Sequence, residues 1–222
     1  MVNLSPSTLN LFLDCPACFW LKFNKKVNRP QGIFPSLPGG MDNVIKKYFD
    51  QHRVAGTLPP ELNGKIPGQL LKDTELIKKW RNWRNTDLIY TDSSLNVQLS
   101  GAIDECVILD DGSYSPVDYK TRGWPVKEGG SAVYQNQLDC YGLLFASKGY
   151  KVANSGYLIY YIPSNVSNNG IIQFNIDVVE MPINIVDAKK TIENAVTCLN
   201  SNIPDASPEC VYCKYLEQMA QI

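Results

Sequence analysis

The sequence predicts an α/β fold with a central mixed β-sheet flanked by helices, and three observations support this prediction. Strand-sized apolar runs alternate with longer segments of helical pattern along the chain. The chain has 222 residues, of which 44% are hydrophobic, so it is long enough to bury a core. Its longest apolar runs are strand-sized, and none approaches the length of a membrane span.

The expected elements follow one another in a simple order. Ser5 is a suitable helix cap and Pro6 suits the first helical position, so the first helix should begin there. Helices are expected at residues 5 to about 23, 40–53, 73–84, 131–149 and 185–199. Strands are expected near residue 88 and at 97–109, 114–120, 157–162 and 171–180.

The segment Asp110-Asp111-Gly112 has the turn residues that would join two of these strands as a hairpin.

The chain is expected to form a single domain over residues 1–222. We divide it into an N-terminal helical region at about 1–86, a core at about 87–183, and a C-terminal helix with a cysteine-containing tail at about 184–222. No internal repeat or low-complexity tract indicates a second domain.

The charges are unevenly distributed although the chain carries a net charge of only −1. Residues 1–84 contain 13 Lys and Arg against 6 Asp and Glu, a net charge of +7, whereas residues 85–222 contain 8 against 16, a net charge of −8. This asymmetry is expected if the first part helps to hold phosphates and the second part holds cations. Solvated surface charge is the alternative explanation.

Asp104, Asp118 and Lys120 form the most informative constellation. They lie on the two strands that the hairpin joins, so the two carboxylates can approach each other. A hard divalent cation such as Mg²⁺ takes carboxylate oxygens as ligands and assists phosphodiester hydrolysis. Lys120 follows Asp118 by two residues and therefore points to the same face of its strand. The alternative is a surface hairpin whose charged side chains are simply solvated.

The helix that follows places Gln137 and Tyr141 on one face, at positions i and i+4. They either lie beside the acidic site or form a buried tyrosine with a hydrogen-bonded glutamine.

These pieces together resemble the PD-(D/E)xK nucleases, and among them the RecB-like exonucleases, including the iron–sulfur nucleases of CRISPR adaptation. The likeness rests on residues in the same order across almost the whole chain: Leu4-Ser5-Pro6-Ser7, Cys15-Pro16, Gly101-Ala102-Ile103-Asp104, Pro116-Val117-Asp118-Tyr119-Lys120-Thr121, Gln137-Leu138-Asp139-Cys140-Tyr141, and finally Cys210 and Cys213. The resemblance implies a restriction-endonuclease-like core.

The resemblance also implies roles for single residues. Asp104 and Asp118 would bind a catalytic Mg²⁺ or Mn²⁺, with the backbone carbonyl of Tyr119 as a further ligand. Lys120 would position or activate the attacking water. Gln137 and Tyr141 match the family's helix motif beside the site.

One departure from the family concerns a metal-binding histidine that often follows a glycine on an early helix. The segment Gly39-Gly40-Met41-Asp42-Asn43 occupies that place and contains no histidine. The only histidine, His52, lies further along and is not assigned to the metal. Asp42 could supply an oxygen ligand instead, although an acidic residue in a first helical turn also suits the helix dipole.

Four of the seven cysteines form a second constellation. Cys15 with Cys18 and Cys210 with Cys213 are two C-x-x-C pairs, which could close one tetrahedral site joining the two ends of the chain. The resemblance favours a [4Fe–4S] cluster, but its relatives typically use one early and three late cysteines, so structural Zn²⁺ stays open. Disulfides rank third. The remaining cysteines, Cys106, Cys140 and Cys198, are expected to be small buried hydrophobes.

Trp80 and Trp83 alternate with cations in the segment from Lys78 to Arg84. The two indoles could stack unpaired bases, or a helix could bury both.

The sequence thus predicts an intracellular, cytoplasmic Mg²⁺- or Mn²⁺-dependent deoxyribonuclease, an exonuclease on single-stranded or frayed DNA ends. Helicase or CRISPR adaptation subunits are candidate partners, and no membrane is involved. The alternative is a catalytically inactive nucleic-acid-binding or scaffold protein with the same fold and a structural zinc or iron–sulfur site.

Overall fold

The computed structural model describes residues 1–32 and 36–221 of the chain. Its α-helices are α1 (Pro6–Asp14), α2 (Pro16–Trp20), α3 (Ser36–Ala55), α4 (Thr74–Arg81), α5 (Gln135–Ser147), α6 (Ile185–Leu199) and α7 (Val211–Met219). Short helical turns of other types are η1 (Leu21–Lys25), η2 (Pro60–Leu62) and η3 (Ala132–Tyr134). None of the helices in these described ranges has the length and apolar character needed to cross a bilayer.

The strands form two sheets. A five-stranded mixed sheet has the order β2-β5-β6-β7-β8, and a three-stranded mixed sheet has the order β1-β4-β3. The bounds are β1 (Val2–Leu4), β2 (Gln69–Leu70), β3 (Ile89–Asp92), β4 (Val97–Ser100), β5 (Glu105–Ile108), β6 (Tyr114–Thr121), β7 (Ser155–Val166) and β8 (Ile172–Pro182). Strands β6 and β7 are parallel, and the other pairs in the larger sheet are antiparallel.

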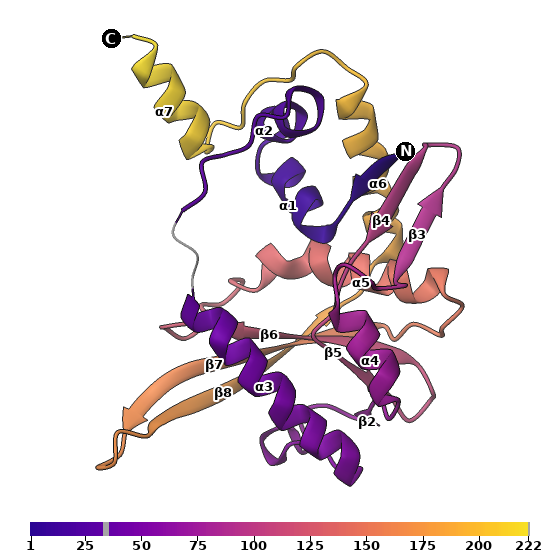
Figure 1. Ribbon diagram of the computed structural model, residues 1–222, viewed down its shortest axis with the longest axis vertical. Coiled ribbons are helices and arrows are strands. Elements are labelled where there is room, and N and C mark those ends of the chain that lie inside the picture. Colours follow the sequence, from indigo (N-terminus) through magenta and orange to yellow (C-terminus); the bar gives the residue numbers. More distant parts are fainter. Residues whose placement is uncertain (33–35, 222) are drawn as a thin grey trace.

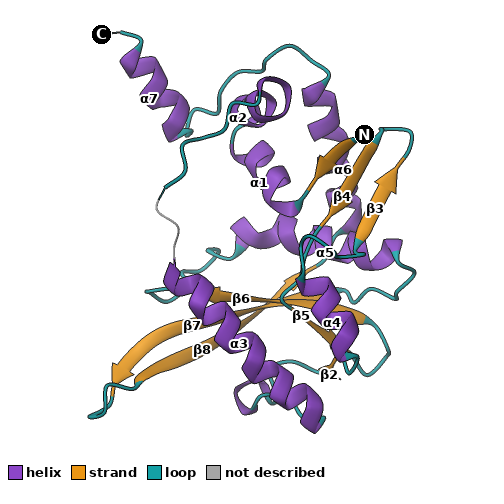
Figure 2. Cartoon of the chain, in the orientation of Figure 1, coloured by secondary structure: helices purple, strands orange, loops and turns teal. Residues whose placement is uncertain are grey.

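The larger sheet is covered on both faces. Alternate residues of β7 enter two different cores: Tyr157 and Ile159 pack with Phe49 of α3, whereas Leu158 and Tyr160 pack with residues of α5. The period of two along a strand explains this division. Figure 1 shows α3 across the larger sheet, with α1, α2 and α6 beside the smaller one. Figure 2 shows the same arrangement by element type.

The prediction of one strand over residues 97–109 is wrong, because the chain leaves the smaller sheet after β4 and enters the larger sheet at β5. Gly101 lies in this crossover. A Cβ atom on Gly101 would lie 3.0 Å from Leu144 Cδ1 and 3.4 Å from Pro6. A side chain at this position would require Leu144 or Pro6 to shift by a few tenths of an ångström, so the close packing favours glycine. The single central sheet of the prediction is in fact two sheets.

Two helix predictions also need correction, and one helix was not predicted. The first helix begins as expected, with Ser5 and Thr8 forming a capping box, but it breaks at Cys15 and continues as α2 from Pro16. The helix expected to reach residue 84 ends at Arg81. The C-terminal tail forms a further helix, α7, which the sequence pattern did not indicate.

The hairpin between β5 and β6 is as predicted. The strands are antiparallel, with Glu105 opposite Val117, and Gly112 in the turn has a positive φ of 78°. The Asp111 carboxylate accepts a hydrogen bond of 2.9 Å from the amide nitrogen of Ser113. Such an Asx contact fixes a tight turn.

A buried ionic network ties this hairpin to two helices. Glu105, the first residue of β5, is fully buried and pairs with Arg53 of α3 at 2.5 Å and Arg81 of α4 at 2.9 Å. Arg81 also binds Asp50 at 2.9 Å and the backbone carbonyl of Asp104 at 2.8 Å. Burial raises the pKa of Glu105, although both guanidinium groups oppose this effect. Neither arginine is therefore available to bind phosphate.

Replacing Arg53 with Met should lower the free energy of unfolding by about 3 kcal/mol, because Glu105 would lose one of its two partners while remaining buried. Urea unfolding followed by circular dichroism measures this change. Lys151→Met, which breaks the exposed pair with Asp111, is the control and should cost less than about 1 kcal/mol. Equal effects of the two variants would show that the network does not secure the hairpin.

Candidate functional site

Strand β6 directs two of its charged side chains toward α5. Val117 and Tyr119 face the core beneath α3, so Asp118 and Lys120 point to the opposite face. The Lys120 ammonium pairs with Asp118 Oδ2. The expected same-face arrangement of these two residues is therefore present.

Asp104 lies immediately before β5 and turns toward the same place. Its Oδ2 atom accepts a hydrogen bond of 3.1 Å from the amide nitrogen of Tyr119, the residue that directly follows Asp118. The β5–β6 pairing produces this contact, because it sets Glu105 opposite Val117. The Asp104 carboxylate thus contacts the peptide group that joins Asp118 to Tyr119, and it lies close enough to Asp118 to influence that carboxylate electrostatically.

Gln137 of α5 connects the remaining predicted residues. Its Nε2 atom lies 2.8 Å from Asp118 Oδ1 and 2.6 Å from the Tyr141 hydroxyl, and its Oε1 atom accepts a hydrogen bond of 3.1 Å from Lys120 Nζ. One amide side chain thereby orients a carboxylate and an ammonium group. The structure brings Asp118, Lys120, Gln137 and Tyr141 into one hydrogen-bonded group.

The sequence analysis missed Tyr134, which also contacts this group. The Lys120 ammonium lies 4.3 Å from the centre of the Tyr134 ring, a cation–π distance. Tyr134 comes from η3, the turn that precedes α5. A tyrosine three residues before Gln137 was visible in the sequence, but its spacing alone carried no signal.

Burial controls the electrostatics of Asp118. The residue is only 2% exposed, and burial together with the nearby Asp104 carboxylate raises its pKa to about 7, while Lys120 acts in the opposite direction. Apart from its close approach to Lys120, the buried Oδ2 atom has no hydrogen-bond partner within residues 1–32 and 36–221. A second positive charge at this place would stabilise the ionised carboxylate.

The donors at this place suit a hard divalent cation. Asp104 and Asp118 offer carboxylate oxygens on adjacent strands, and Asp118 Oδ2 lacks a conventional hydrogen-bond donor. Mg²⁺ and Mn²⁺ prefer such oxygen donors. The residues therefore fit the metal that the resemblance implies.

Lys46 of α3 is a second residue that the sequence analysis missed. Its ammonium lies 2.9 Å from Asp104 Oδ1 and 2.8 Å from Asp42 Oδ2. Burial disfavours the charge on Lys46, but the two carboxylates outweigh burial and raise the pKa of Lys46. Asp42 thus lies at the edge of the site, next to a lysine that it shares with Asp104. The i,i+4 spacing of Asp42 and Lys46 was the only available signal.

Tyr119 and His52 do not bring their side chains into the acidic site. The side chain of Tyr119 points away from the site, and its hydroxyl contacts Glu105 at 3.2 Å, so only its backbone could take part. His52 forms a 2.9 Å hydrogen bond with Thr57 at the end of α3.

The four cysteines of the two C-x-x-C pairs meet at one point. The sulfur atoms of Cys15, Cys18, Cys210 and Cys213 all lie within 4.8 Å of one another. Cys18 Sγ lies 3.6 Å from both Cys210 Sγ and Cys213 Sγ, and Cys15 Sγ lies 3.9 Å from Cys213 Sγ. This cluster could bind a metal. Cys106 and Cys140 are fully buried as expected, whereas Cys198 is only partly buried.

Backbone and side-chain donors surround the cluster. Arg29 donates a 3.3 Å hydrogen bond to Cys210 Sγ and pairs with Asp14 at 2.5 Å. Burial alone would raise the pKa of Cys210, but hydrogen bonds from Cys213 and the neighbouring thiols lower it to about 7. Burial and contacts among the thiols raise the pKa of Cys18 and of Cys213 instead. Of these three thiols, Cys210 alone is shifted toward the thiolate form that metals bind.

Of the two tryptophans between Lys78 and Arg84, one is buried and the other is exposed. Trp80 is fully buried, whereas Trp83 follows the end of α4 and is 72% exposed. The expectation that a helix buries both is therefore right for Trp80 and wrong for Trp83.

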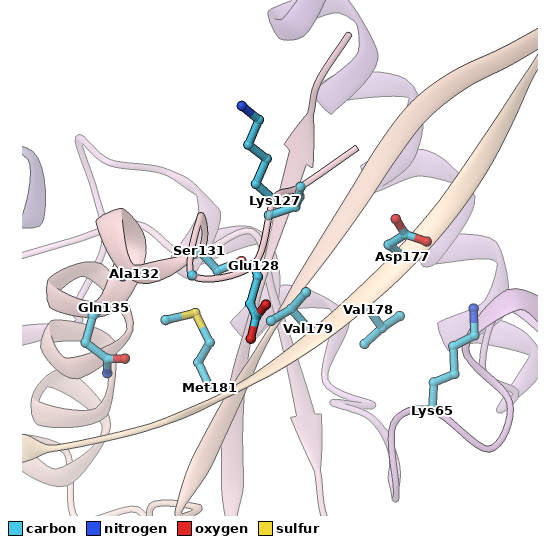
Figure 3. Close-up of a pocket in the computed structure, with 12 residues that line it drawn as sticks. Lys65, Lys127, Glu128, Ser131, Ala132, Gln135, Asp177, Val178, Val179 and Met181 are labelled. Atoms are coloured by element: carbon cyan, nitrogen blue, oxygen red, sulfur yellow. The ribbon is translucent and has the colours of Figure 1, made fainter. Parts of the chain in front are cut away.

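Two cavities flank the loop and helix that carry the site. A cavity of about 720 Å³ lies beside β8 and contains none of the predicted site residues; Met181, Val179 and Gln135 line it (Figure 3). A second cavity of about 390 Å³ is lined in part by Gln137 and Tyr141. We call Asp104 and Asp118, with the side chains that contact them, the acidic group. Of these two cavities, only the second adjoins it.

Similarity to a known protein family identifies the superfamily of this chain. No curated protein matches the chain. The crystal structure of SSO0001 is similar over 97% of this chain and 84% of that chain, with 14% sequence identity and a TM-score of 0.47. The family model of the PD-(D/E)XK nuclease superfamily matches residues 41–218, which include every residue of the acidic group. By this match, the chain belongs to the PD-(D/E)XK nuclease superfamily.

Proposed function

We propose that this protein is an Mg²⁺- or Mn²⁺-dependent DNA nuclease that acts as an exonuclease on single-stranded or frayed ends. Its family membership supports a metal-dependent nuclease. The observation that carries the proposal is the contact of the Asp104 carboxylate with the peptide group that follows Asp118, together with the Lys120 ammonium paired with Asp118. The two carboxylates can hold a metal that assists phosphodiester hydrolysis, and the amine can orient the attacking water or the phosphate.

Each residue has a defined task in this proposal. Asp104 and Asp118 hold the cation, with the Tyr119 carbonyl as a further ligand. The bound cation supplies positive charge that neutralises the charge developing on the phosphate oxygens. Lys120 orients the attacking water or the phosphate, and Gln137 keeps its ammonium in place through a 3.1 Å hydrogen bond.

Asp42 is a further candidate ligand. The Lys46 ammonium links the Asp42 carboxylate to that of Asp104, because it lies at hydrogen-bond distance from both. The same lysine supports the alternative function, an inactive nucleic-acid-binding protein, because an internal cation already neutralises part of the acidic group. The cleavage assay below decides between these functions.

For the cysteine cluster, we propose a single structural ion, Zn²⁺. Four thiolates in a tetrahedron around Zn²⁺, each about 2.3 Å from the ion, lie about 3.8 Å from one another. Three of the six sulfur pairs are separated by 3.6, 3.6 and 3.9 Å, which is close to this value, and all six pairs lie within 4.8 Å. A [4Fe–4S] cluster binds each thiolate to a different iron and needs wider spacing. The spacing thus favours zinc, whereas resemblance to the RecB-like iron–sulfur nucleases favours iron.

The wild-type protein should degrade labelled single-stranded DNA in the presence of Mg²⁺ or Mn²⁺, and Asp118→Ala or Lys120→Ala should lower the rate at least about 100-fold. Gel electrophoresis of the products measures the rate and separates exonuclease from endonuclease cleavage. Lys151→Ala, which changes an exposed lysine elsewhere, is the control. Wild-type activity that both site variants retain would remove the assigned site, whereas DNA binding without cleavage would favour the inactive alternative.

Gln137→Ala should lower the cleavage rate about 10- to 100-fold, because Lys120 and Asp118 would lose the amide that orients both. Its thermal midpoint should stay within a few degrees of the wild-type value. Tyr141→Phe keeps the buried ring and serves as the matched variant of the same network, with a smaller expected loss. A rate unchanged in Gln137→Ala would show that Lys120 is oriented by other contacts.

Protein purified without air should be colourless and contain one Zn²⁺ per chain. Elemental analysis and absorption spectroscopy measure this. Cys213→Ser should lose zinc and thermal stability, whereas Cys198→Ser, which changes a cysteine outside the cluster, should keep the metal. A brown protein containing about four irons per chain would instead establish the iron–sulfur cluster.

A further inference from the structure

Several residues that line the cavity next to the acidic group have no role in the proposed nuclease mechanism. Besides Gln137 and Tyr141, its lining includes Trp83, Ser5, Ser7 and Asn10. Its volume of about 390 Å³ falls within the range of about 300–1,000 Å³ that is usual for small-ligand sites. Since Gln137 also contacts Asp118, the cavity opens directly beside the reacting centre.

Trp83 is the unusual member of this lining. Its indole is 72% exposed, although burying such a ring would stabilise the fold. Helix α4 ends at Arg81, and after Asn82 the chain carries Trp83 away from the core that holds Trp80. Unlike other exposed rings, Trp83 lines a polar cavity, where its face can stack on a ligand held in that cavity.

Arg84 provides the accompanying charge. Its guanidinium lies 4.9 Å from the centre of the Trp83 ring. Among residues 1–32 and 36–221, no carboxylate forms an ion pair with Arg84. An exposed indole beside a free guanidinium is the arrangement that stacks an unpaired base and attracts its phosphate.

The opposite wall is polar and comes from the beginning of α1. Ser5 and Ser7 lie at this helix start, and no acidic residue occupies its first turn. The Ser5 hydroxyl caps the helix. The Ser7 hydroxyl and the Asn10 amide nitrogen can form hydrogen bonds with sugar and phosphate oxygens, and the positive end of the helix dipole favours the phosphate charge. The cavity therefore combines a ring for a base with polar groups for a backbone.

We propose that this cavity binds one unpaired nucleotide of a DNA strand, with the base on Trp83 and the sugar–phosphate along Ser5 and Ser7. This assignment rests on the proposed nuclease function and deepens it, because a base inside a duplex is stacked on its neighbours and cannot lie against Trp83. The cavity would select single-stranded or frayed ends next to the acidic group. It also gives the Leu4-Ser5-Pro6-Ser7 motif a place in substrate binding.

The test measures binding of a fluorescently labelled oligothymidylate by anisotropy, without added divalent metal, so that cleavage does not interfere. Trp83→Ala should weaken binding about tenfold, as expected for the loss of one stacked base. Trp83→Phe should restore most of the affinity. Binding of a blunt duplex of the same length should stay unchanged in both variants.

Trp124→Ala is the matched control, because Trp124 is 81% exposed and does not line the cavity. This variant should bind the oligonucleotide like the wild type. Because Trp83 is exposed, Trp83→Ala should also fold normally, which a thermal melt checks. An unchanged affinity in Trp83→Ala, or an equal loss in Trp124→Ala or on the duplex, would overturn the proposed nucleotide site.

The cleavage assay separates failure of this site from failure of the proposed function. A wild type that cleaves single strands, together with a Trp83→Ala variant that binds and cleaves them equally well, overturns the nucleotide site and leaves the nuclease in place. A wild type that never cleaves but loses single-strand affinity on Trp83→Ala supports the site and overturns the enzymatic function.

Discussion

The register between β5 and β6 is the constraint on which the acidic group depends. With Glu105 opposite Val117, Asp104 comes beside the Tyr119 amide and Asp118 faces α5. A slip by one residue would exchange the two faces of β6, burying Asp118 in the core beneath α3 and turning Tyr119 toward Gln137. The fully buried pairing of Glu105 with two arginines opposes such a slip, because it holds the first residue of β5 between α3 and α4.

The same strand therefore serves two purposes. On one face of β6, Val117 and Tyr119 complete an apolar core, and on the other face Asp118 and Lys120 are nearly buried among polar partners. Burying a carboxylate is costly unless it is paired. Gln137 and Lys120 supply that pairing, so the stability of the strand and the orientation of the acidic group depend on the same contacts.

The sequence could predict the features that follow from local patterns. The turn at Gly112, the cap at Ser5 and the alternation of Asp118 with Lys120 are local, and the structure contains all three. Features that depend on contacts distant in sequence could not be predicted. The crossover at Gly101 and the exposure of Trp83 depend on where neighbouring segments lie, which periodicity does not reveal. Helix α7 has no buried residue, so packing does not account for it.

The acidic group shows the same limit. The i,i+4 spacing of Gln137 and Tyr141 predicted that both lie on one face of a helix, and the family resemblance predicted that this face lies beside the site. Tyr134 and Lys46 enter only through tertiary contacts, since one comes from a turn and the other from α3, far from β6 in the sequence. Lys46 also changes the charge of the group. When ionised, Asp42, Asp104 and Asp118 with Lys46 and Lys120 carry a net charge of −1. A divalent cation would reverse this sign to +1, so attraction of a phosphodiester to the group would itself depend on the metal.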